Sequence, residues 1–181
     1  MLVLMLSILS LPLFYLFSRR YFSRPISIGL LSIFSTSIYL VIYSRFSWSP
    51  NVLPFLILLS FYALLRSVAL SEKHRERWFL IASGAIAITT QIHFNAFFVV
   101  PAITAAFLIL RRPHFRWRTW IAAAGIFALL YAPVIASDIA THGQNLGYFF
   151  DKLSGGSVNS LERTVQKFSR VLNSDASEYF L

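Results

Sequence analysis

One stretch of this 181-residue chain, residues 78–110, constrains the fold more than any other. It is almost unbroken in its apolar character, with one polar interruption at 89–95, which reads Thr-Thr-Gln-Ile-His-Phe-Asn. A membrane-crossing helix needs roughly 20 residues, so the stretch is too long for one helix and suits two short ones. Basic residues flank both ends, at 73–77 and 111–118, and basic residues concentrate on the cytoplasmic side of membranes. The sequence therefore predicts a helical hairpin, 78–92 and 95–110, whose tip near His93 lies on the outer side.

The composition is that of a membrane protein. Hydrophobic residues make up 57% of the chain and charged residues only 13%, against roughly 25% charged residues in a soluble domain. The formal charge of +9 comes from basic residues that flank apolar blocks, so membrane topology and anionic lipid headgroups explain it better than nucleic acid does. The chain contains no cysteine, which excludes a disulfide framework and a thiolate metal site. We expect an all-α, polytopic bundle in contact with membrane lipids and no nucleic acid.

The apolar blocks predict six crossings with both termini outside. They cover residues 1–17, 26–43, 52–70, 78–92, 95–110 and 119–137. The inner loops hold ten Lys and Arg residues and the short outer loop holds only Arg45, a strong positive-inside bias. We therefore expect a transmembrane bundle at 1–137 and an outer loop and tail at 138–181. In that tail an apolar side recurs at helical spacing and predicts an outer amphipathic helix, through Leu161, Val165, Phe168 and Leu172.

Two polar features lie inside the predicted crossings. The second crossing contains Ser32, Ser35, Thr36 and Ser37, and small hydroxyl residues allow close helix packing and hydrogen bonds between helices in a bilayer. Arg66 lies about one turn from the cytoplasmic end of the third crossing. We expect its long side chain to snorkel to the headgroups.

The residues that could bind a ligand or take part in a reaction are predicted to lie on the outer side. No phosphate-binding loop, dinucleotide fingerprint or zinc-protease motif occurs, and the scattered histidines lack metal-ligand spacing with carboxylates, so neither a metal nor a cofactor is indicated. Gln91, His93 and Asn95 at the hairpin tip are costly in a bilayer unless they find partners. They either cap the turn between two helices or form a ligand site with Arg45 and Asp138, which fall on the same side. Such groups suit a phosphate-bearing lipid, because Arg binds phosphate and amide and imidazole groups bind hydroxyls.

A family resemblance rests on three segments. Residues 44–54, Ser-Arg-Phe-Ser-Trp-Ser-Pro-Asn-Val-Leu-Pro, resemble a stretch of bacterial glycosyltransferase family 39 proteins. These belong to the GT-C class and are related to protein O-mannosyltransferases and the aminoarabinose lipid A transferase. The hairpin, from Gly84 through the Gln91-Ile92-His93 turn to Pro101, is similar to that family's Gly-rich helix, Gln-x-His turn and return helix. The segment from Tyr131 to the 138–150 loop resembles the family's next segment after the return helix, so the resemblance covers about residues 1–150.

This resemblance implies a GT-C-like bundle in the bacterial plasma (inner) membrane. It implies sugar transfer from a polyprenyl-phosphate-linked donor on the extracytoplasmic face, with Arg45 and His93 on the phosphate side and Gln91 and Asn95 on hydroxyls. Family members use an acidic residue in a long outer loop after their first helix, and nothing like it precedes Met1. We therefore expect a partial chain that is inactive alone, with the catalytic residue unknown and Asp138 not assigned to that role. The alternatives are a lipid or small-solute transporter and a non-catalytic membrane scaffold.

Overall fold

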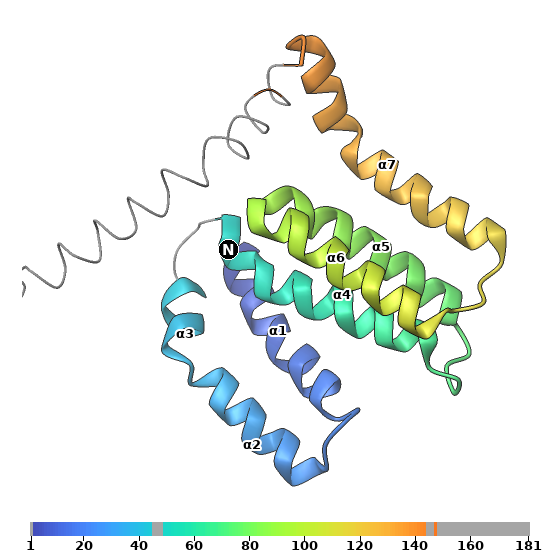
Figure 1. Cartoon of the computed structure of the whole chain (residues 1–181). Coiled ribbons are helices and arrows are strands. Elements are labelled where there is room, and N and C mark those ends of the chain that lie inside the picture. Colours follow the sequence, from blue (N-terminus) through green and yellow to red (C-terminus); the bar gives the residue numbers. More distant parts are fainter. Residues whose placement is uncertain (1, 45–48, 144–146, 148–181) are drawn as a thin grey trace, which may run out of the picture. The chain divides into compact units, whose positions relative to one another are not determined.

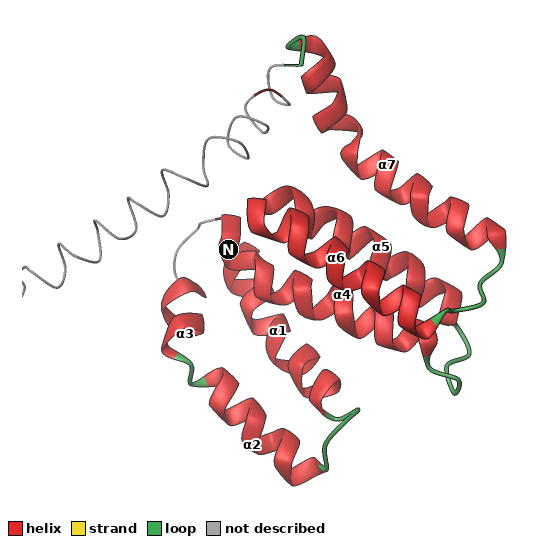
Figure 2. Cartoon of the chain, viewed as in Figure 1, coloured by secondary structure: helices red, strands yellow, loops and turns green. Residues whose placement is uncertain are grey.

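The computed structural model describes residues 2–44, 49–143 and 147. In this part of the chain the secondary structure is helical and contains no strand (Figures 1 and 2), so the predicted all-α class is confirmed. The elements are α1 (Leu2–Ser18), α2 (Arg24–Ser35), α3 (Ile38–Ser44), the 3₁₀ turn η1 (Ser49–Val52), α4 (Leu53–Val68), α5 (Arg75–Ile92), α6 (Phe94–Arg111) and α7 (Trp117–Ala140).

The chain divides into two compact units, residues 1–131 and 132–181. The first unit holds α1 to α6 and the part of α7 that ends at Tyr131. The second begins at Ala132, within α7. The predicted boundary at residue 137 depends on membrane topology, which this division does not test, and stays a prediction. The predicted amphipathic helix around 161–172 lies outside the described residues.

The core of the first unit is built around α4, α5 and α6. In Figure 1 these three helices run side by side, with α4 packed along α5 and α5 along α6; α1 packs on α4. Ala63 and Ala82 are completely buried, and small side chains let helices approach closely in a membrane protein. The buried cluster combines these alanines with larger apolar side chains: Ala63, Leu64, Phe79, Ala82, Ile86, Ala96, Val100 and Ala123.

The predicted second crossing at 26–43 is wrong as one continuous helix. It is broken between α2, which ends at Ser35, and α3, which begins at Ile38. The Ser32 carbonyl accepts hydrogen bonds from Ser35 Oγ at 3.0 Å, from Thr36 Oγ1 at 2.8 Å and from the Thr36 N–H at 3.1 Å. The hydroxyl groups expected to bind neighbouring helices thus bond to the end of their own helix, because a Ser or Thr side chain can compete for backbone carbonyls.

Membrane-crossing potential is clearest in the last two helices. Among the described helices, α6 with 18 residues and α7 with 24 are long and apolar enough to cross a membrane. The apolar helices α1, α2 and α4 are shorter, and α5 begins with the charged residues Arg75, Glu76 and Arg77. The predicted sixth crossing at 119–137 lies within α7. The six-crossing bundle itself is not confirmed by helix length and composition.

Arg66 is held by neighbours instead of simply snorkelling. Its guanidinium forms an ion pair with Glu72, donates to Tyr62 Oη at 3.2 Å and lies 4.9 Å from the ring centroid of Trp78. Burial raises the pKa of Glu72, but hydrogen bonds from the His74 backbone N–H and from Arg66 outweigh it and hold that pKa below the ordinary value. These contacts join the last turn of α4 to the loop and the first turn of α5. The Arg66 cation is thereby paired at the junction of two core helices.

Candidate functional site

The predicted hairpin is confirmed, with a break of one residue. The first arm, α5, ends at Ile92 and the second, α6, begins at Phe94. Between them His93 has extended backbone angles, φ −145° and ψ 134°. The polar interruption at 89–95 therefore does not form a loop, and the chain reverses at a single position.

His93 caps the second arm. Its Nδ1 accepts a hydrogen bond from the backbone N–H of Asn95 at 3.2 Å, which satisfies one of the unpaired amides at the start of α6. The capping interpretation is thus confirmed for His93, and the ligand-site interpretation stays a prediction. Because Nδ1 accepts this bond, the neutral imidazole carries its proton on Nε2. That N–H is the group with which the ring can donate to a ligand.

The other two tip residues differ in their surroundings. The Gln91 amide donates through Nε2 to the Ala87 carbonyl at 3.0 Å, back along its own helix. The side chains of Gln91 and Asn95 are exposed and that of His93 is half-buried. The tip thus presents two amides and one imidazole within five residues of chain. Such groups bind hydroxyl and phosphate oxygens through hydrogen bonds.

Two further hydroxyls of α5 bond to groups of α7, and the sequence did not reveal these partners. Thr90 Oγ1 and Tyr131 Oη lie 2.7 Å apart, and Ser83 Oγ donates to the Ala123 carbonyl at 2.9 Å. Ser83 and Thr90 are two helical turns apart and so share one face of α5. Both bonds fasten α5 to the part of α7 that belongs to the first unit. The seven-residue spacing of these hydroxyls is a sequence signal that could have pointed to this face.

The remaining predicted site residues are not brought to the tip by the structure. Arg45 lies outside the described residues. Asp138 is half-buried and belongs to the second unit, whereas the tip belongs to the first. Their grouping with His93 stays a prediction. In the described part of the chain no three His, Asp or Glu residues lie together as metal ligands would.

The two basic ends of the hairpin lie together, as predicted. Residues 73–77 at the start of α5 and residues 114–115 after α6 line one pocket. The Arg75 guanidinium carbon lies 6.0 Å from the centroid of the Phe115 ring. The polar tip and the basic ends are therefore at opposite ends of an antiparallel pair of helices.

The match to a known family covers most of this architecture. Residues 1–136 match the model of the family described as dolichyl-phosphate-mannose-protein mannosyltransferase. No curated protein and no solved structure matches the chain. The matched range includes the 44–54 segment and the whole hairpin, which are the segments that carry the glycosyltransferase resemblance. The chain therefore belongs to the dolichyl-phosphate-mannose-protein mannosyltransferase family, whose members are integral membrane glycosyltransferases of the GT-C type.

Proposed function

We propose that this protein takes part in sugar transfer from a polyprenyl-phosphate-linked donor on the outer face of the bacterial plasma membrane. Family membership supports the reaction class. The observation that carries the donor assignment is the one-residue break at His93, which sets an imidazole between two exposed amides at the hairpin end opposite the basic clusters. A lipid phosphate at the headgroup boundary is a ligand that such a tip can meet.

In this proposal the lipid phosphate is the leaving group. Its charge develops as the bond to the sugar breaks, so preorganised donors near it lower the barrier. His93 donates through Nε2–H and Arg45 supplies a permanent positive charge. Gln91 and Asn95 bind hydroxyls. We assign no metal or cofactor to this step. A carboxylate would act as the base that activates the acceptor, and we assign no residue to that role.

The proposed topology has six crossings and both termini outside, with α2 and α3 together forming the second crossing. The chain has no native cysteine, so single cysteines report accessibility without background. Asn95→Cys at the tip should react with an impermeant maleimide added outside intact cells. Ser23→Cys and Ser71→Cys, both exposed in loops, should react only after permeabilisation. Labelling of Ser71→Cys from outside would exclude the proposed orientation of the hairpin.

The donor assignment is tested by binding. Purified protein in detergent micelles should bind a polyprenyl-phosphate sugar about tenfold or more tightly than the matching polyprenol, because a hydrogen bond to a charged group is worth roughly 1.5–3 kcal/mol. A fluorescent analogue titrated against both competitors measures this preference. Equal competition by the polyprenol and the polyprenyl-phosphate sugar would contradict the proposal. Protein-dependent lipid movement across liposomes without a phosphate preference would favour the transporter alternative.

A further inference from the structure

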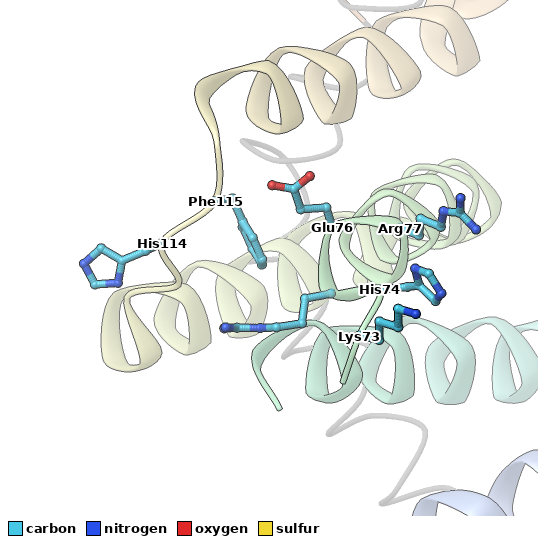
Figure 3. A pocket seen from close by; sticks show the side chains of 7 residues that line it. Lys73, His74, Glu76, Arg77, His114 and Phe115 are labelled. Atoms are coloured by element: carbon cyan, nitrogen blue, oxygen red, sulfur yellow. The ribbon is translucent and has the colours of Figure 1, made fainter. Parts of the chain in front are cut away.

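A pocket of about 360 Å³ lies at the basic end of the hairpin. Two separate connections form it, the α4–α5 loop with the first turn of α5 and the α6–α7 connection (Figure 3). Its volume falls in the range of roughly 300–1,000 Å³ that small-molecule sites occupy. The lining side chains are Lys73, His74, Arg75, Glu76, Arg77, His114 and Phe115.

The charge in this pocket is strongly unbalanced. Its lining includes three cations, Lys73, Arg75 and Arg77, and a single carboxylate, that of Glu76. The ion pair found in the described part of the chain is between Arg66 and Glu72, so no protein carboxylate there pairs with the three pocket cations. They also lie at the positive end of the α5 dipole, where cations are disfavoured. A bound anion would relieve both sources of repulsion.

The pocket has one apolar, rigid wall. Phe115 packs on Phe79, with ring centroids 4.7 Å apart, and lies 6.1 Å from Trp120. Arg75 is held beside that wall by the bond from its Nε to the Ser67 carbonyl at 2.9 Å. In Figure 3, Lys73, His74 and Arg77 gather at the start of α5, while His114 and Phe115 come from the other connection. The pocket thus combines basic side chains from the start of α5 with the aromatic ring of Phe115 from the other connection.

Tryptophan residues at this end of the hairpin favour a position at a membrane boundary. Trp78, Trp117 and Trp120 lie at or beside the two helix starts, and tryptophan concentrates at the headgroup level of membranes. The anions available in quantity at that level are lipid phosphates. We propose that the pocket binds the phosphate of an anionic phospholipid, with its glycerol against Phe115. This inference does not depend on the proposed sugar transfer, because it concerns the opposite end of the hairpin.

A simpler explanation is that these cations only orient the protein by the positive-inside rule. That explanation depends on the number of charges on one side, whereas a site depends on the particular charges in the pocket. Arg116 and Arg118 are exposed basic residues beside the same α6–α7 connection but do not line the pocket. They provide a control that removes the same charge from the same end.

The test uses the whole chain in neutral detergent micelles and a fluorescent phosphatidylglycerol as the probe. Phosphatidylglycerol should bind about tenfold or more tightly than phosphatidylcholine, because basic residues near a surface attract anionic lipid by about 1 kcal/mol each. The double variant Lys73→Gln/Arg77→Gln should lose that preference, and Arg116→Gln/Arg118→Gln should keep it. An equal loss in both double variants would overturn the proposal in favour of general surface charge.

Two further measurements complete the design. Inorganic phosphate and glycerol 3-phosphate at the concentration of the lipid should not displace it; displacement would assign the pocket to a soluble phosphate and overturn the lipid source. The second measurement is amine acetylation of the wild-type protein, so its result does not depend on whether any variant folds. Phosphatidylglycerol should slow the modification of Lys73 relative to Lys152 of the same chain, and phosphatidylcholine should not. Identical Lys73 rates with the two lipids would also overturn the proposal.

Discussion

Replacing Ala82 with leucine should destabilise the protein by about 3 kcal/mol, at the upper end of the usual cost of overpacking. Ala82 is completely buried in the core cluster of the first unit. Its neighbours in that cluster include the equally buried Ala63, together with Leu64 and Phe79. Helices in a bilayer gain little from burying apolar surface against each other, so their association depends on close packing. Three added carbon atoms at Ala82 would force the helices apart and forfeit that packing.

The matched control is Ala106→Leu, at an exposed alanine of α6. It makes the same chemical change where no helix of the first unit covers the side chain. The variants are unfolded in mixed micelles by increasing the fraction of a denaturing detergent, and unfolding is followed by circular dichroism. The free energy of unfolding should fall strongly for Ala82→Leu and change little for Ala106→Leu. Equal stability of the two variants would mean that α4 and α5 are not packed at Ala82.

Two variants of His93 should separate its two roles. His93→Ala removes the cap of α6 and should cost about 1 kcal/mol of stability, whereas His93→Asn should keep most of it because Asn is among the best N-cap residues. If Nε2–H of His93 also binds the donor phosphate, both variants should bind a polyprenyl-phosphate analogue about tenfold more weakly. The capping role depends on the side-chain acceptor, and the binding role depends on the imidazole donor.

Melting temperature and analogue affinity are measured on the same preparations. His142→Asn serves as the histidine control, because His142 is exposed and belongs neither to the 91–95 tip nor to the lining of the basic pocket. It should leave analogue affinity unchanged. Wild-type affinity in folded His93→Asn would remove His93 from the donor site and leave it only the cap. A fall in affinity confined to His93→Ala would instead mean that the cap shapes the site and the imidazole does not contact the ligand.

Much of the hairpin could be predicted from the sequence. Apolar length and flanking charge predicted two helices that reverse near His93, and the reversal is at that residue. The 44–54 segment and the Gln-x-His turn indicated the family that residues 1–136 match. The role of the site was harder to predict from the sequence, because capping and ligand binding require the same polar residues at the tip. Only the bond from the Asn95 amide to His93 established the cap.

Other features were invisible until the chain was folded. At the break after α2, the Ser35 and Thr36 hydroxyls donate to the Ser32 carbonyl of their own helix instead of to a neighbouring helix. The length of an apolar block does not indicate which of these acceptors a hydroxyl will use. Arg66 meets its partners because the chain after α4 folds back, so that Glu72 in the loop and Trp78 in α5 lie beside the last turn of α4. The bond between Thr90 and Tyr131 joins residues 41 positions apart.

The sequence by itself determined the class of the protein, the hairpin and the clustering of basic residues at one end of it. These depend on how each segment partitions between hydrocarbon and water, and partitioning is a property of the segment's own residues. The tertiary structure decided which polar groups pair, where the second apolar block breaks and which basic residues line a pocket. Each of these depends on distances between segments that only packing brings together, since a hydrogen bond is lost within a few tenths of an ångström beyond roughly 3.2 Å.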